Sequence, residues 1–152
     1  MPTPSLHAGF GTFFPRSGAV LLAVTAGAKL LSGVGGNTQA LDFPDPLLGL
    51  SNRETLILVA AIELGIMAGL VSRISAPMKY LLAAWLGGNF LLYRLALMIL
   101  QPGQPCKCLG ALTEKIHLDD RTAGLLLTLI SLYLMAGGLW LYFRHPRPVL
   151  EG

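Results

Sequence analysis

The stretch "YLLAAWLGGNFLLYRLALMIL", residues 80–100, decides the fold. It contains 21 residues and a single charge, Arg94. A helix rises about 1.5 Å per residue, so a run of this length crosses the roughly 30 Å of hydrocarbon in a bilayer. In lipid, only helices and closed barrels satisfy every backbone polar group. We therefore expect a transmembrane helix over residues 80–100.

Three more apolar runs of similar length occur, at residues 17–36, 55–72 and 122–143. The 152-residue chain is 53% hydrophobic and 12% charged, with a mean hydropathy of +0.63. Soluble domains carry roughly 25% charged residues, about twice as many. The sequence thus predicts one all-α transmembrane domain over residues 1–152, an integral membrane four-helix bundle in contact with lipid.

The net charge of +3 comes from 11 basic and 8 acidic residues and is too weak and scattered for a nucleic-acid surface. No basic run, phosphate-binding glycine loop or zinc-ligand spacing occurs. We expect no nucleic-acid partner and no metal site. Glycines recur in the apolar runs and indicate close helix packing: Gly65, Gly69, Gly87, Gly88, Gly137 and Gly138.

The linkers between the runs differ in length. The short linker "RISAPMK", residues 73–79, predicts an antiparallel hairpin of the second and third spans. In the first linker, "DPLLGL" (residues 45–50) can lie flat on the membrane surface. The third linker, residues 101–121, ends in Asp119 and Asp120, which can cap the last helix.

Basic residues in the loops predict the orientation. With both termini inside, the inner segments carry Arg16, Arg73, Lys79, Arg144 and Arg147, against Arg53, Lys107, Lys115 and Arg121 outside. This bias favours an N-in, C-in topology with loop 101–121 outside, in a disulfide-permissive compartment. A competing interpretation makes the first run a secretory signal cleaved after Ala26-Gly27-Ala28.

Three ionisable residues lie inside the spans: Lys29, Glu63 and Arg94. Such residues are usually paired or functional. In the predicted topology each lies six to eight residues from the outer end of its span, roughly 9–12 Å below the surface. They form either a structural ion pair, Glu63 with Lys29 or Arg94, or an intramembrane polar pocket. Further polar or aromatic contacts can come from Trp85, Asn89, Tyr93 and Tyr133.

Cys106 and Cys108, the only two cysteines, flank Lys107 in the outer loop. A disulfide between them closes almost no chain and gains little stability, and strained disulfides are easily reduced. Lys107 lowers the pKa of a neighbouring thiol, and Pro105 and Gly110 supply turn residues. Redox chemistry is therefore the favoured interpretation. Unpaired thiols without a role, and metal binding with His117 as a third ligand, are the alternatives.

The cysteine motif "C-x-C-[LF]-G" follows the third span, with a lysine in "AGAKLL", a glutamate in "AIELGIM" and an arginine in "LYRLAL". Together these resemble the MauE/DoxX-like redox-associated membrane proteins over about residues 18–143. The family motif more often reads C-G-C-F-G, whereas Lys107 and Leu109 stand here. The resemblance implies a four-helix bundle of the bacterial inner (cytoplasmic) membrane that supports maturation of periplasmic disulfide-bearing proteins.

The layout is also similar to vitamin K epoxide reductase and DsbB-type quinone-coupled oxidants, which carry a second cysteine pair that this chain lacks. The favoured function is thus a thiol–disulfide oxidoreductase with Cys106 and Cys108 as catalytic residues. Its partner is a periplasmic thioredoxin-like or cysteine-containing client, and a quinone is the candidate cofactor. The alternatives are a non-catalytic subunit or assembly factor of a larger membrane oxidoreductase, and a small transporter with Glu63 as proton carrier.

Overall fold

The computed structural model describes residues 6–35, 41–42, 44–45, 47–100 and 120–145. These residues contain four helices: α1 (Leu6–Gly35), α2 (Asn52–Val71), α3 (Ala76–Leu100) and α5 (Asp120–Arg144). Each helix is long and apolar enough to cross a membrane. The expectation of an all-α four-helix membrane bundle is confirmed.

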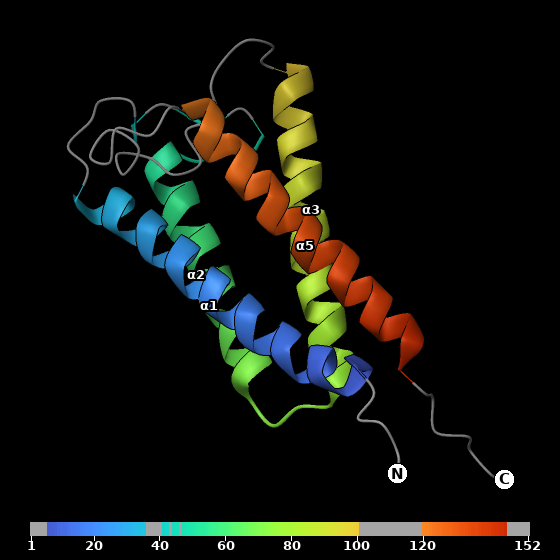
Figure 1. Ribbon diagram of the computed structural model, residues 1–152. Coiled ribbons are helices and arrows are strands. Elements are labelled where there is room, and N and C mark those ends of the chain that lie inside the picture. Colours follow the sequence, from blue (N-terminus) through green and yellow to red (C-terminus); the bar gives the residue numbers. More distant parts are fainter. Residues whose placement is uncertain (1–5, 36–40, 43, 46, 101–119, 146–152) are drawn as a thin grey trace, which may run out of the picture.

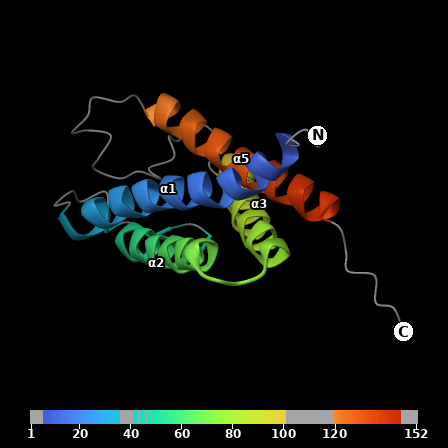
Figure 2. The ribbon, with the colours of Figure 1, turned by 60° about the horizontal axis from the view of Figure 1, so that its bottom comes forward.

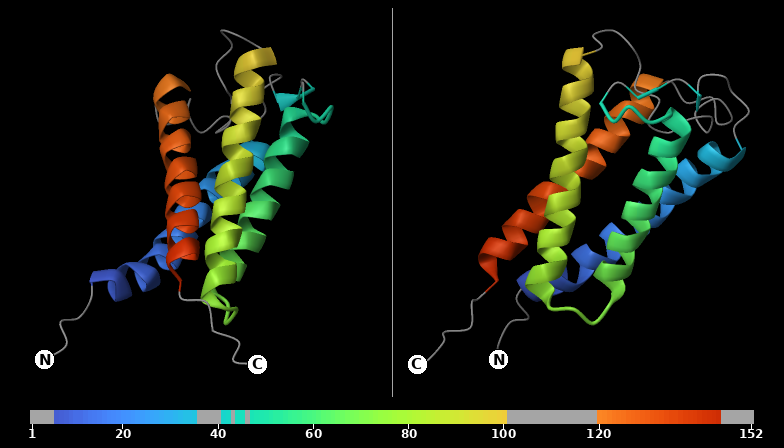
Figure 3. Two further views of the ribbon diagram at one scale, coloured as in Figure 1. Left: turned by 90° about the vertical axis from the view of Figure 1, so that its right-hand side faces the viewer. Right: turned by 180° about the vertical axis from the view of Figure 1, so that it is seen from behind.

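The helices run alternately up and down, so the N-terminal end of α1 and the C-terminal end of α5 lie at the same end of the bundle (Figure 1). The opposite end holds the described residues of the first linker, the end of α3 and the start of α5 (Figure 3). We call the first the terminal end and the second the linker end. With four spans, the start of α1 and the end of α5 lie on the same side of the membrane.

The helices associate as two pairs, α1 with α2 and α3 with α5 (Figure 2). The short linker makes α2 and α3 antiparallel, as expected, but their mutual packing is much sparser than that within the pairs. The main core lies toward the terminal end, where Phe14, Leu70, Tyr80, Leu134 and Leu141 are buried together. The two pairs therefore join at the terminal end and leave α2 and α3 less closely packed elsewhere.

Helix α1 starts at Leu6 and thus extends beyond the N-terminal limit of the predicted span 17–36. Pro15, inside α1, has no N–H to donate to the carbonyl of Gly11 four residues earlier. The Tyr80 hydroxyl of α3 donates to this Gly11 carbonyl at 3.1 Å. In lipid an unsatisfied carbonyl costs on the order of several kcal/mol. The tyrosine thus supplies the hydrogen bond that the proline removes, and the helix continues through Pro15.

The start of α2 is fixed by a capping box that the sequence analysis missed. The Glu54 N–H donates to Ser51 Oγ at 3.2 Å, and the Ser51 N–H donates to Glu54 Oε2 at 2.9 Å. This reciprocal pattern is typical of Ser-x-x-Glu sequences. For the last helix, Asp119 lies outside the described residues and α5 begins at Asp120.

Two glycines let α3 and α5 pack backbone against backbone. A Cβ atom at Gly87 would lie 2.5 Å from the carbonyl oxygen of Ser131 and 2.7 Å from the amide nitrogen of Met135. A Cβ atom at Gly138 would lie 2.5 Å from the carbonyl oxygen of Tyr80. Gly65, by contrast, has open space around it. The packing interpretation therefore holds for Gly87 and Gly138, whereas Gly65 faces outward.

The outward faces of the helices are apolar, as a lipid environment requires. Large hydrophobic side chains more than half exposed occur on all four helices and include Val20, Val24, Leu31, Val71, Leu92, Leu95, Met98, Ile99, Leu125 and Leu129. In water this density of exposed aliphatic side chains would be an aggregation hazard. These faces contact membrane lipid.

We predict that Gly87→Ala weakens the bundle because its Cβ atom would meet backbone atoms of α5. Overpacking of this kind costs about 1–3 kcal/mol. Gly65→Ala is the matched control, since its Cβ meets nothing within 4 Å. Unfolding of both variants in detergent measures the effect. Equal stability of the two variants would contradict the close α3–α5 contact.

We also predict that Tyr80→Phe lowers the free energy of unfolding by about 0.5–1.5 kcal/mol, the net value of one hydrogen bond. In a Pro15→Ala background the same change should have a smaller effect, because the introduced alanine supplies its own N–H to the Gly11 carbonyl. A double-mutant cycle measured by detergent unfolding tests this coupling. Additive effects would show that the hydroxyl does not compensate for the proline.

Candidate functional site

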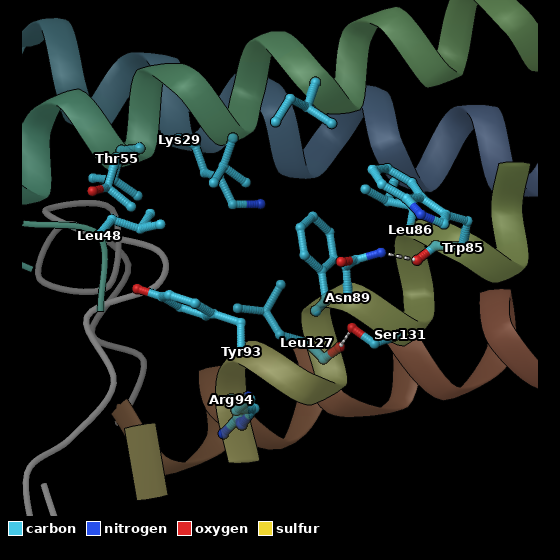
Figure 4. Close-up of a pocket in the computed structure, with 14 residues that line it drawn as sticks. Lys29, Leu48, Thr55, Trp85, Leu86, Asn89, Tyr93, Arg94, Leu127 and Ser131 are labelled. Carbon is cyan, nitrogen blue, oxygen red and sulfur yellow. Dashed lines mark hydrogen bonds between the residues drawn. The ribbon is translucent and has the colours of Figure 1, made fainter. Parts of the chain in front are cut away.

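A cavity of about 280 Å³ lies between α2 and α3, in the half of the bundle nearest the linker end (Figure 4). Its size is close to the lower limit of small-molecule pockets, roughly 300 Å³. The lining is mostly apolar and aromatic, with a few polar groups. It includes Lys29, Leu48, Thr55, Trp85, Asn89, Phe90, Tyr93, Arg94, Leu127 and Ser131.

Lys29 of α1 forms a buried ion pair with Glu63 of α2. The Lys29 ammonium donates to Glu63 Oε1 at 2.6 Å, and the two side chains are only 6% and 1% exposed. Of the two ion pairs that the sequence left open, the structure thus contains the one with Lys29. The ammonium also lies 5.4 Å from the ring centroid of Phe90 at the cavity wall, a cation–π distance.

Glu63 itself does not line the cavity, and only Lys29 connects the pair to it. The second oxygen of the carboxylate, Glu63 Oε2, is buried without a hydrogen-bond partner among the described residues. The Thr25 hydroxyl lies beside this carboxylate. It donates to the carbonyl of Leu22 at 3.2 Å.

Arg94 of α3 lines the same cavity, but its guanidinium donates to the backbone carbonyl of Gly124 on α5. A side chain at position 124 would collide with this guanidinium. The structure therefore brings Lys29 and Glu63 into contact and places Arg94 at the opposite wall, paired with a carbonyl. The cations Lys29 and Arg94 thus line one cavity. The anion Glu63 lies outside the cavity lining and neutralises Lys29.

A closed turn in the first linker borders the cavity at the linker end. The N–H groups of Leu47 and Leu48 donate to Asp45 Oδ1 at 2.9 and 3.0 Å, and Gly49 adopts φ 66°. The Tyr93 hydroxyl of α3 donates to Asp45 Oδ2. The described residues of "DPLLGL" thus form a turn that is hydrogen-bonded to α3, and Leu48 lines the cavity. The position of this segment on the membrane surface stays a prediction.

The other side chains expected at a polar pocket divide into two groups. Trp85, Asn89 and Tyr93 line the cavity. Tyr133 does not, because its hydroxyl lies 2.7 Å from Ser17 Oγ at the α1–α5 contact. The sequence analysis missed Asp45, although Asp-Pro followed by Gly49 is a recognised turn signal. It also missed Thr55, Phe90 and Ser131, for which the sequence carries no comparable signal.

The cysteine motif, Cys106, Lys107, Cys108 and Gly110, lies outside the described residues. The helix ends on either side of it, Leu100 and Asp120, both lie at the linker end (Figure 3). Among the described residues, no group of three or more His, Cys, Asp or Glu side chains could hold a metal ion.

Comparison with known proteins finds no matching family model, curated protein or solved structure. The resemblance to MauE/DoxX-like proteins therefore stays a prediction from the sequence.

We predict strong coupling between Lys29 and Glu63. Lys29→Met should lower the free energy of unfolding by roughly 3–5 kcal/mol, because it leaves a buried carboxylate without its cation. The double variant Lys29→Met/Glu63→Leu should recover a large part of this loss, since an apolar pair needs no partner. Detergent unfolding of the single and double variants measures the coupling. A double variant no more stable than Lys29→Met would contradict it.

Proposed function

We propose that this protein is a membrane thiol–disulfide oxidoreductase. In the proposed reaction, Cys106 and Cys108 take electrons from a client protein and pass them to a quinone in the α2–α3 cavity. One observation carries the proposal: the cavity, lined by cationic and aromatic side chains, lies in the half of the bundle from which the cysteine-bearing segment departs.

The chemistry balances with one cysteine pair. A client thiolate attacks the Cys106–Cys108 disulfide, and the mixed disulfide is then resolved by the second client thiol. The client gains a disulfide, and Cys106 and Cys108 become a dithiol. The dithiol then gives two electrons to the quinone and releases its two protons, and the disulfide re-forms. The quinone takes up two protons and becomes a quinol. No second cysteine pair is needed if the client approaches loop 101–121 directly.

The cavity suits an acceptor whose oxygens gain negative charge. The Arg94 guanidinium lines it and is paired with a carbonyl instead of a carboxylate, and a cation placed near a developing oxyanion stabilises it. The Lys29 ammonium, neutralised by Glu63, adds hydrogen-bond donors to the same lining. Trp85, Phe90 and Tyr93 provide aromatic surface for a planar ring. Trp85 lines the cavity and is more than half exposed on the outer surface of α3, so the cavity lining extends to a surface that a membrane-dissolved molecule can reach without crossing water.

The proposal includes a location. We place the protein in the bacterial inner (cytoplasmic) membrane, with both termini inside and loop 101–121 in the periplasm, where disulfides persist. Its client would be a periplasmic thioredoxin-like or cysteine-containing protein. The basic residues of the loops support this orientation, and it agrees with the start of α1 and the end of α5 lying at the same end of the bundle.

We predict that Cys106→Ser or Cys108→Ser traps a mixed disulfide with the client. The remaining thiolate attacks the disulfide of the oxidised client, the reverse of the proposed exchange, and the second cysteine that would release the client is missing. Acid-quenched cells analysed on a non-reducing gel should show a reducible adduct with one of the two variants. Wild type should show a Cys106–Cys108 disulfide that labels from outside only after reduction, and that becomes reduced when quinone is depleted. The variant Cys106→Ser/Cys108→Ser is the matched control and should form no adduct.

Two results would contradict the oxidoreductase. One is the absence of any adduct with both single variants, and the other is a pair that stays reduced whatever the quinone supply. Stable copurification with a larger oxidoreductase, together with full function of the cysteine-free variant, would support a non-catalytic subunit instead.

A further inference from the structure

Buried polar side chains line one face of α1, where it packs against α2. Thr25, Lys29 and Ser32 are 6%, 5% and 2% exposed, and their spacing of four and three residues places them on the same side of the helix. Polar groups within a membrane span are expensive and usually functional. We call these three residues the polar row of α1.

The polar row leads toward the linker end of the bundle. Ser32 is followed by Gly33, whose carbonyl accepts a hydrogen bond from Arg53 Nη1 at 2.9 Å. Arg53 is about one-third exposed, and Asp42, which lies 3.8 Å from it, is largely exposed. The linker-end side of the row is therefore close to charged groups that contact water, whereas Lys29 lies about one helical turn deeper.

Glu63 joins this row from α2 and has room for a proton. Its Oε1 accepts from Lys29 at 2.6 Å, whereas Oε2 has no hydrogen-bond partner among the described residues. The side chain is only 1% exposed. The Thr25 hydroxyl lies beside the carboxylate but donates to the Leu22 carbonyl, so an ionised oxygen here has fewer donors than it would have in water. Binding a proton at Oε2 removes that deficit.

Lys29 is the only member of the pair that lines the cavity. The other ionisable groups at the cavity are occupied: the Tyr93 hydroxyl donates to Asp45, and Arg94 donates to Gly124. The Lys29 ammonium has three N–H donors, and Glu63 Oε1 takes one of them. A proton on Glu63 can thus reach the cavity through Lys29.

We propose that the Lys29–Glu63 pair is a proton-transfer site that connects the water-accessible linker end of α1 and α2 with the cavity. The inference rests on the proposed function only for the recipient of the proton, the quinone. The binding of a proton by Glu63 is independent of it.

The proposed proton transfer has three steps. With Lys29 as an ammonium and Glu63 protonated at Oε2, Lys29 donates a proton to an oxygen of the reduced quinone. Glu63 gives its proton to the neutral amine, which restores the ion pair. A proton arriving along the polar row of α1 then reloads Oε2. Two such cycles complete the quinol, while the two thiol protons of the cysteine pair leave to the outer solution.

Infrared spectroscopy of the full-length protein in lipid nanodiscs tests proton binding at Glu63 directly. We expect a pH-dependent carbonyl stretch of a buried carboxylic acid. This band should shift in Glu63→Asp, which keeps a carboxyl group, and disappear in Glu63→Gln. Glu54→Gln, which alters an exposed carboxylate on the same helix, is the control and should keep the band. If no band belongs to Glu63 at any pH at which the bundle stays folded, the proposal is wrong.

A kinetic measurement tests delivery to the cavity. Protein with reduced Cys106 and Cys108 is mixed with a short-chain ubiquinone, and quinol formation is followed in a single turnover. Glu63→Gln should bind the quinone as wild type does, judged by quenching of Trp85 in a Trp140→Phe background. Its quinol formation should be slower by roughly 10²-fold, with the pH dependence of the rate lost.

The outcomes separate the two proposals. A Glu63 proton band without any quinone reduction by wild type would reject the proposed function and leave a proton-binding site. Quinone reduction with a normal rate and pH profile in Glu63→Gln would reject proton transfer and leave the oxidoreductase. Weaker quinone binding by Glu63→Gln, with an unchanged rate at saturation, would also reject proton transfer.

Discussion

The ion pair between Lys29 and Glu63 is the interaction on which the rest of the structure depends. In a membrane, neither charge can remain without a partner, so α1 and α2 must pack with these two positions in contact. This requirement fixes the rotation and the vertical register of one helix against the other. Apolar packing alone does not fix them, because lipid tails compete with apolar side chains for the same surfaces. The pair also sets which face of α1 carries Lys29 to the cavity.

The second pair of helices is fixed by a different device. α3 and α5 approach each other through Gly87 and Gly138, where backbone meets backbone. These backbone contacts gain dispersion energy because the two helices come close together. A glycine, however, has no side chain that could fill the space beside the contact. Thus an electrostatic contact holds α1 to α2 and a steric contact holds α3 to α5. Between them, α2 and α3 pack sparsely, and the cavity occupies this position.

The class of the fold could be predicted from the sequence because the thickness of the membrane sets the length of each hydrophobic span independently of the other spans. Hydrophobic runs near 20 residues locate the four helices without any knowledge of their neighbours. The sequence gives no sign that α1 continues N-terminally past Pro15 and Arg16, because a proline and a charge resemble the end of a span. Its continuation depends on Tyr80, which donates to the Gly11 carbonyl from 69 residues further along the chain. Which helices pair closely is likewise decided by contacts between distant residues. The short α2–α3 linker predicts that these helices are antiparallel, but not how closely they pack.

The candidate site was predictable to the same extent. An isolated charge in a span is visible in the sequence, so Lys29, Glu63 and Arg94 could be chosen. A partner such as the Gly124 carbonyl leaves no signal in the sequence.

The different roles of the two cations follow from their partners. Arg94 donates to a carbonyl dipole, which carries no net charge, so its positive charge remains available to an anion in the cavity. Lys29 donates to a carboxylate and contributes almost no net charge, but it has a group behind it that can exchange a proton. The proposed reduction of a quinone would need both properties, since negative charge must first be stabilised and then neutralised by protonation. The two cations come from opposite walls of the α2–α3 cavity, and their partners suit them to different steps of that proposed reaction.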